Sequence, residues 1–213
     1  MIGAALRHGF DMPYDNNTIL ITGTARTPAE YSHSVYGEAF YRLTLDAKRL
    51  SGTVDSIPVT VSERLLLDMP VEEDMRFFVR GQIRSYNQRT ESGSRLIITV
   101  FAREFENADD AADGNEAELT GSVCKRVIYR TTPFDREIAD VLIAVNRRYG
   151  KSDYLPLIAW GRNARFLKDM PVGTELKVLG RLQSREYKKQ TESGESVNRT
   201  AYEVSCSAVE PIY

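Results

Sequence analysis

The chain has 213 residues, of which 42% are apolar and 27% are charged, with a formal net charge of −2. This length allows one large domain or two small ones, and the composition is that of an ordinary soluble protein. No run of about 18 apolar residues exists, so no transmembrane helix is expected. The N-terminus lacks the sustained apolar core of a signal peptide, and two cysteines are too few for a disulfide framework. These features predict a reduced, cytoplasmic setting and no membrane partner.

Several short segments occur twice, in the same order and about a hundred residues apart. The pairs are I-L-I-T-G-T (19–24) with A-E-L-T-G-S (117–122), I-P-V-T-V (57–61) with L-P-L-I-A (155–159), D-M-P-V (68–71 and 169–172), F-V-R-G-Q-I-R-S (78–85) with K-V-L-G-R-L-Q-S (177–184), and T-E-S-G (90–93 and 191–194). Such ordered self-similarity indicates a tandem duplication. We therefore predict a first domain over 1–106, an acidic linker over 107–116 and a second domain over 117–213.

The elements of each copy follow one layout. In the first copy, strand-like segments flank S-E-R-L-L-L-D-M (62–69), which takes the place of a helix. In the second copy, strands are predicted over 117–122, 139–147, 154–160, 174–187 and 198–209, with a short helix over 161–170 whose inner face carries Ala164, Leu167 and Met170. Three strands, a short helix and two strands are the order of the OB-fold, a five-stranded Greek-key barrel. The chain is thus predicted to be all-β with short helices, as two tandem OB-folds, with T-E-S-G as the turn between strands four and five.

Basic and aromatic residues alternate on the outer faces of the second copy. Along 174–187, alternation directs Leu176, Val178, Gly180 and Leu182 inward and Lys177, Leu179, Arg181, Gln183, Arg185 and Tyr187 outward. Tyr154 and Trp160 share the outer side of the preceding strand, Tyr149 lies in a loop beside Arg147, Arg148 and Lys151, and Lys188 and Lys189 extend the basic run. Cations follow phosphates and flat rings stack on bases, as single-strand binding requires. The alternatives to a binding site are that the aromatic residues pack in the core and that the basic run is only a solvent-exposed hairpin.

These residues resemble a known family. L-I-A-W-G-R-N-A, followed by E-L-K-V-L-G-R-L-Q-S-R-E-Y-K-K and a glycine turn, is similar to the bacterial single-stranded DNA-binding proteins (SSB). The similarity is clear over 118–209 and weaker over 18–106. It implies stacking on DNA bases by Tyr149, Tyr154, Trp160 and Tyr187. The chain stops at V-E-P-I-Y, so the family's acidic recruiting tail is expected to be missing, which leaves recruitment of replication or repair proteins open.

The first copy departs from this pattern. Ser51, Ser56 and Ser62 stand in the positions of Tyr149, Tyr154 and Trp160, and only Tyr86 remains, four residues before T-E-S-G as Tyr187 is. Arg84 and Tyr86 still belong to a basic strand face. Charge is also divided, because residues 1–114 have a net charge of −5 and residues 115–213 of +3. We expect the second barrel to supply most of the binding energy and the first to serve mainly pairing and stability.

No constellation in the sequence supports catalysis. There is no Gly-rich phosphate loop and no helix with paired metal ligands, so neither an enzyme nor a metal or cofactor site is expected. His8 and His33 are expected to be isolated surface residues in or near loops. The preferred interpretation is a bacterial, nucleoid-associated protein that binds and protects single-stranded DNA as a homodimer with four OB-folds. The alternatives are a primosome-type OB-fold assembly protein and a single-stranded RNA binder.

Overall fold

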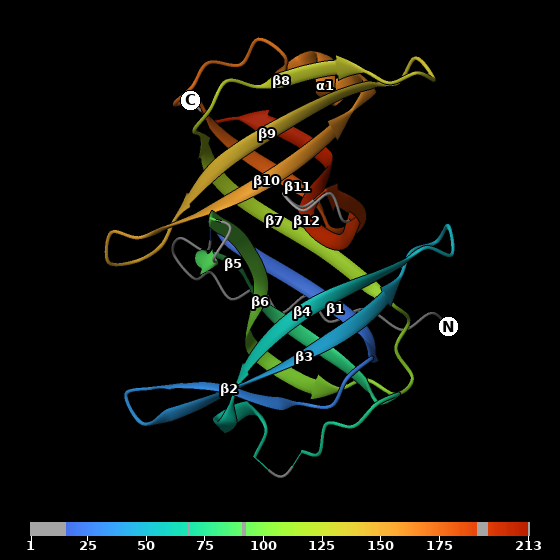
Figure 1. Ribbon diagram of the computed structural model, residues 1–213, viewed down its shortest axis with the longest axis vertical. Helices are drawn as coiled ribbons and strands as arrows, with labels where there is room; N and C mark the ends of the chain where they lie inside the picture. The colour runs from blue at the N-terminus through green and yellow to red at the C-terminus, as the bar shows by residue number, and fades with distance from the viewer. Residues whose placement is uncertain (1–15, 68, 91–92, 191–195, 213) are drawn as a thin grey trace, which may run out of the picture.

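Two similar halves are joined end to end along the long axis of the molecule (Figure 1). The computed structural model describes residues 16–67, 69–90, 93–190 and 196–212. Twelve strands form one continuous hydrogen-bonded sheet with the order β2-β3-β4-β6-β5-β1-β7-β11-β12-β10-β9-β8. The additional pairings β3–β1 and β7–β9 close each half into a barrel. The chain therefore has two OB-fold barrels, as the sequence predicted.

The first barrel contains β1 to β6. Its elements are β1 (Asn17–Ala25), β2 (Glu30–Val35), β3 (Glu38–Lys48), β4 (Val54–Ser62), the 3-10 helix η1 (Glu63–Leu65), β5 (Arg76–Thr90) and β6 (Gly93–Asn107). Buried and more exposed residues alternate along β1 and β3, and this alternation places Ile21, Leu43 and Leu45 in the core. Ser62 caps η1, because its side chain accepts a hydrogen bond from the backbone nitrogen of Arg64.

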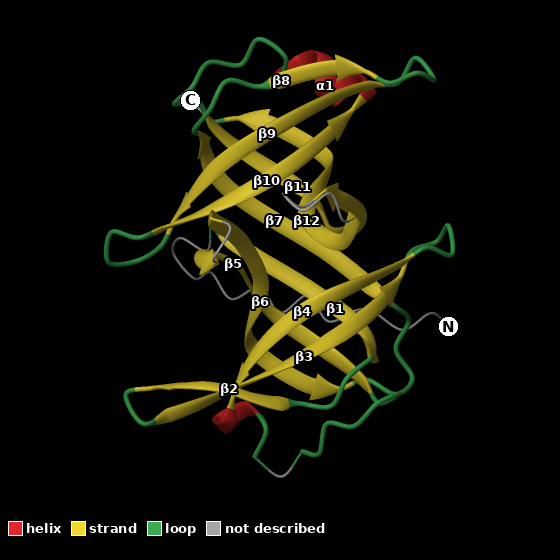
Figure 2. Ribbon diagram, in the orientation of Figure 1, coloured by secondary structure: helices red, strands yellow, loops and turns green. Residues whose placement is uncertain are grey.

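The second barrel repeats this order. Its elements are β7 (Gly114–Val123), β8 (Ile128–Thr131), β9 (Glu137–Asn146), β10 (Ser152–Trp160), α1 (Gly161–Leu167), β11 (Glu175–Gln190) and β12 (Ser196–Pro211). Among the described residues, helix occurs only in η1 and α1, which lie at opposite ends of the molecule (Figure 2). Ala164 and Leu167 of α1 are fully buried and Met170 packs against the core, so the predicted inner face of this helix is confirmed.

The barrels are joined through their first strands. β1 and β7 pair in antiparallel fashion, with Ile19 opposite Ala117 at the centre. At the two ends of this pairing, one asparagine side chain holds the backbone of each long hairpin. Asn17 bonds to both the nitrogen and the oxygen of Ile83 at 2.8 Å, and Asn115 makes the same pair of bonds to Leu182 at 3.0 and 2.6 Å. The two halves are thus related by a local two-fold symmetry.

Each long hairpin also contacts the opposite barrel. The backbone nitrogen of Ser85, in β5, donates to Asp153 of β10 at 2.5 Å, and the Ser85 hydroxyl accepts from the nitrogen of Tyr154 at 2.7 Å. The symmetry-related contacts join Ser184 of β11 to Asp55 and Ser56 of β4, at 2.9 and 3.2 Å. Consequently, the two hairpins cross the boundary between barrels and meet near the centre of the molecule.

Several details differ from the sequence expectations. An additional strand, β2 or β8, precedes the second predicted strand of each copy, and the first copy has only η1 in its helix position. The expected linker is shorter, because β6 ends at Asn107 and β7 begins at Gly114. The second T-E-S-G lies outside the described residues, as do Glu91 and Ser92 of the first. In the described part of the chain, no helix has the length and apolar composition needed to cross a bilayer.

Candidate nucleic-acid interface

A groove of about 470 Å³ lies where the two long hairpins meet. Tyr86 of β5 and Tyr187 of β11 both line it, and 41% and 38% of their surfaces are exposed. Its lining includes Pro58 of β4 and Pro156 of β10, which stand at matching positions of the two barrels. The hairpins also touch directly, because Arg95 donates a hydrogen bond to the backbone oxygen of Thr200 at 3.5 Å. One groove is therefore built from both barrels.

The groove is basic. Arg42, Arg95 and Arg199 line it, and among the described residues that line it none is acidic. Arg42 donates to the phenol oxygen of Tyr86 at 3.1 Å, which orients this ring. The guanidinium carbon of Arg185 lies 6.0 Å from the centre of the Tyr187 ring. Each tyrosine thus has a cation beside it, an arrangement that suits a flat base attached to a phosphate.

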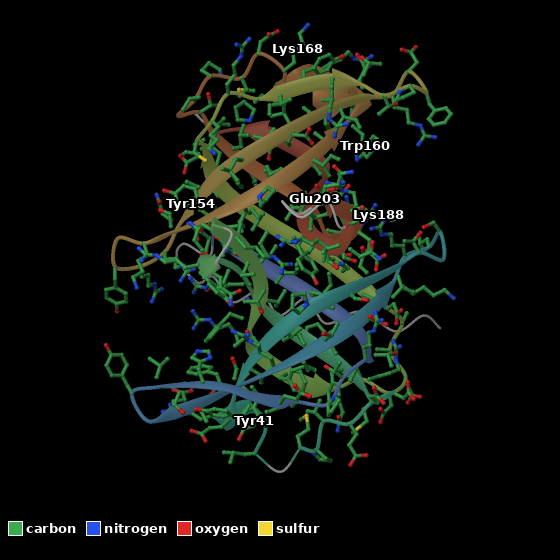
Figure 3. All side chains as sticks on the ribbon, in the orientation of Figure 1. Tyr41, Tyr154, Trp160, Lys168, Lys188 and Glu203 are labelled. Carbon is green, nitrogen blue, oxygen red and sulfur yellow. The ribbon has the colours of Figure 1, made fainter. Side chains whose placement is uncertain are left out.

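The second barrel presents two further rings on β10. Tyr154 and Trp160 alternate with Leu155, Leu157 and Ala159, which are buried, and remain 47% and 40% exposed. In Figure 3, Tyr154 lies near one end of β10, Trp160 near the other, and Lys188 on the adjacent hairpin. Both rings therefore point outward from the barrel, as the alternation in the sequence predicted.

Tyr149 lies at the tip of the loop between β9 and β10. Its side chain is almost fully exposed, at 98%. Its φ angle is 69°, in the left-handed region that a bulky residue seldom adopts. Arg148 beside it is exposed. This loop therefore presents a ring and a cation to solvent.

Two predicted phosphate ligands have structural partners. Asp153 is fully buried and forms an ion pair with Arg147 in its own barrel, through both carboxylate oxygens. Arg84 of the other barrel approaches the same carboxylate at 3.4 Å. Burial, and then the neighbouring Arg147, lower the pKa of Arg84. Both arginines lie at the boundary between barrels, and their first role is to neutralise Asp153.

The remaining predicted cations differ in whether a carboxylate lies beside them. Lys177 donates to Glu118 at 2.8 Å, which raises the pKa of Lys177. Arg185 lies 3.9 Å from Glu203, whereas Arg181 and Lys188 are exposed on β11. The side chain of Lys189 is outside the described residues. The structure thus brings Arg185 and Tyr187 together at the groove and leaves Lys177 at the far end of β11.

The strand register changes one expected equivalence. Counted from T-E-S-G, Tyr86 corresponds to Tyr187. Counted from Ser85 and Ser184, which make symmetry-related contacts, Tyr86 corresponds to Arg185, because the second hairpin is longer. Both tyrosines still reach the same groove.

Sequence reasoning missed the residues contributed by the fifth strand of each barrel. Arg95 of β6 and Arg199 of β12 occupy matching positions and both line the groove. The predicted basic residues came only from the fourth strands and from loops. The same alternation argument, applied to β6 and β12, would have placed both arginines on the outward faces of these strands.

Comparison with known proteins gives one family and one fold. Residues 114–212 match the model of the single-strand binding protein family. The wild-type single-stranded DNA-binding protein from Thermus aquaticus is 20% identical, with a TM-score of 0.75 over 92% of this chain and 93% of that chain. A deletion mutant of that protein gives a TM-score of 0.73, with 19% identity over 92% and 94%. The N-terminal domain of PriB from Thermoanaerobacter tencongensis is 42% identical over 44% of this chain and 98% of that chain, with a TM-score of 0.40. No curated protein sequence matches the chain.

Proposed function

Because residues 114–212 match the model of the single-strand binding protein family, we propose that the chain binds single-stranded DNA with little sequence preference. The observation that carries this proposal is the groove between the long hairpins, with Tyr86, Tyr187 and three arginines among its lining residues. Aromatic faces can stack on any base, and arginines can pair with any phosphate, so neither contact depends on sequence. Exposed strands in replication, repair or recombination are the substrate that this chemistry fits.

The strand would pass through the groove and over β10. The groove supplies a ring from each barrel, and Tyr154 and Trp160 continue the series of rings on the second barrel. Tyr149 and Arg148, at the end of the β9–β10 loop, provide a further ring and cation. Base stacking on such rings contributes about 1–3 kcal/mol each. The binding energy is thus concentrated in the second barrel and at the boundary between barrels.

The function is tested by titration with oligo-dT. Trp160 is the one tryptophan of the sequence and is 40% exposed, so its fluorescence reports contact with a base directly. We expect quenching by oligo-dT and little effect from a duplex of the same length. An assembly protein that acts through protein contacts would show no quenching. Stacking alone does not distinguish the two sugars, so an RNA-binding role would be favoured only by stronger quenching with oligo-rU than with oligo-dT.

We also propose that two chains associate, so that the working particle contains four barrels. This proposal rests on the duplication within the chain and on its family. The two barrels of one chain already share a continuous sheet through β1 and β7. Association of two such pairs would place a second central groove in the particle and lengthen the strand that it can hold.

A further inference from the structure

The β2–β3 hairpin of the first barrel carries exposed rings that have no place in the predicted site. Tyr31 is 62% exposed, and Tyr36 at the turn is fully exposed. Tyr36 and Gly37 form a two-residue turn with φ angles of 50° and 84°. Such turns favour asparagine before glycine, because both positions need a positive φ. A tyrosine there is costly for folding, and this cost points to a role outside the fold.

Behind this hairpin, a series of rings leads back across the sheet. The ring of His33 stacks on that of Phe40 with 5.2 Å between centroids, and Phe40 lies 5.7 Å from Phe101 of β6. Tyr31 packs edge-on against Tyr41 at 6.1 Å on the opposite face of the hairpin, because Tyr41 directly follows Phe40 in β3. Phe40 is buried beside His33 and Phe101, so it supports the outer rings. His33 is exposed, as the sequence predicted, but it belongs to β2 and stacks on Phe40, so it is neither isolated nor in a loop.

Arginines stand beside the last ring of this series. The guanidinium carbons of Arg84 and Arg103 each lie 6.0 Å from the centre of Phe101. Arg103 is exposed and donates to Gln82 at 3.2 Å. Two nearby carboxylates are already engaged. Glu38 accepts from Ser62 and pairs with Arg64, and Glu63 accepts from the nitrogen of Ala39. The surface thus offers cations as well as rings.

The same positions of the second barrel lack this arrangement. Strand register places Phe40 next to Ser62, whereas the matching pair on the second barrel is Ile138 next to Trp160. In the same way, Phe101 lies next to Thr60, and its counterpart Ser205 lies next to Ile158. The ring that the first barrel lacks on β4 is thus present on the neighbouring strands.

We propose that the first barrel binds a further stretch of the same single strand through a β2–β3 platform, consisting of His33, Tyr36, Phe101 and Arg103, in which His33, Phe101 and Arg103 share one face. Arg42 connects this platform to the central groove, because it lines the groove from β3 and donates to Tyr86. A strand that leaves the groove on the first-barrel side then meets the platform next. This inference rests on the proposed single-strand binding and specifies where longer strands are held.

The test compares two lengths of end-labelled oligo-dT by fluorescence anisotropy. About 10 nucleotides fall within the range that one OB-fold engages, and about 30 nucleotides exceed it. The platform variant is His33→Ser, Tyr36→Asn and Arg103→Gln. The matched control is Tyr129→Ser and Phe134→Asn, which changes the corresponding hairpin of the second barrel, where Tyr129 and Phe134 are exposed. Circular dichroism checks folding, and Tyr36→Asn alone, which suits the turn, serves as a second variant.

We expect the platform variant to bind the short oligonucleotide as the wild type does and the long one about tenfold or more weakly, with Tyr36→Asn in between and the control unchanged. A long-strand affinity equal to that of the wild type would overturn the platform and leave single-strand binding intact. Equal losses at both lengths, or an equal loss in the control, would also overturn it. Failure of the wild type to bind either length would instead contradict the proposed function itself.

Discussion

Asp55 of the first barrel accepts a hydrogen bond from the backbone nitrogen of Ser184, in the second barrel, at 2.9 Å. The same carboxylate accepts two bonds from Arg49 at 2.6 Å each. Asp153 repeats this arrangement with Ser85 and Arg147. Each buried aspartate therefore holds a loop of its own barrel and a hairpin of the other. The position of the central groove depends on these two carboxylates, because both hairpins that form it are held by them.

Replacement of a buried aspartate should destabilise the whole molecule. In Asp55→Asn, Arg49 loses its charge partner in a site where Asp55 is fully buried. Removal of one partner of a buried ion pair costs about 3–5 kcal/mol, and we expect about 3 because Arg49 is partly exposed. Urea unfolding followed by circular dichroism measures this loss.

Asp140→Asn is the matched control. Asp140 pairs with Arg130 at 2.9 Å, but both side chains are well exposed. Such surface pairs contribute less than about 1 kcal/mol. Similar losses in Asp55→Asn and Asp140→Asn would show that the inter-barrel contact is not important for stability.

Rings of the groove and of β10 should contribute individually to DNA affinity. We expect Trp160→Ala and Tyr187→Ala each to weaken binding of oligo-dT by about 1–3 kcal/mol at fixed salt. The sequence alone suggested a much smaller loss for Tyr86→Ala. Because Tyr86 and Tyr187 line one groove, the structure leads us to expect a comparable loss. A loss for Tyr86→Ala near zero would mean that the strand avoids the first-barrel side of the groove.

Affinity should fall as salt rises. For single strands, the slope of log affinity against log salt is about −0.7 for each phosphate contacted. Arg199→Gln removes a groove cation and should make the slope shallower by about 0.7. Lys168→Gln, beside α1 at the far end of the second barrel (Figure 3), should leave the slope unchanged. Equal slopes for both variants would exclude Arg199 as a phosphate ligand.

Stability should decrease in alkali because of a buried thiol. Burial raises the pKa of Cys206 from 9.0 to about 12. The unfolded chain therefore releases this proton at lower pH than the folded one. The stabilisation is fully present below about pH 9 and is lost as the pH rises towards 12, by about 1 kcal/mol per pH unit. Urea unfolding of the wild type and of Cys206→Ala from pH 8 upward measures it, and identical pH profiles would contradict the assignment.

Association of two chains is tested by light scattering. One chain has a mass of 24.1 kDa. We expect about twice this mass at micromolar concentrations, and the same particle should persist when oligo-dT is added. A mass near that of one chain would show that two barrels are sufficient for the working unit.

Much of the fold was predictable because buried and exposed residues alternate along the strands. Ile19, Ile21, Leu176 and Val178 show this alternation in sequence and are fully buried in the structure. β2 was missed for the opposite reason. All of its residues are at least partly exposed, so E-Y-S-H-S-V has no inward apolar face to reveal it.

The site was less predictable because side-chain pairs between neighbouring strands are not visible in the alternation along one strand. Arg147 was predicted to be a phosphate ligand beside Tyr149, whereas its partner Asp153 lies six residues away on the next strand. Gln183 was placed on an outward face, yet it is buried and donates to Glu203 at 2.9 Å. The platform on β2 and β3 was missed because rings were sought only at positions equivalent to those of the second copy.

The pairing of β1 with β7 within one chain has an evolutionary consequence. In a symmetric dimer of identical barrels, every substitution appears twice, so a change that benefits one half is also imposed on the other. Here the two halves are encoded separately while the backbone pairing of Ile19 with Ala117 keeps them together. Each half can therefore acquire its own ligand preference, as Ser62 with Phe40 in one barrel and Trp160 with Ile138 in the other illustrate. Fusion thus permits division of labour without loss of assembly.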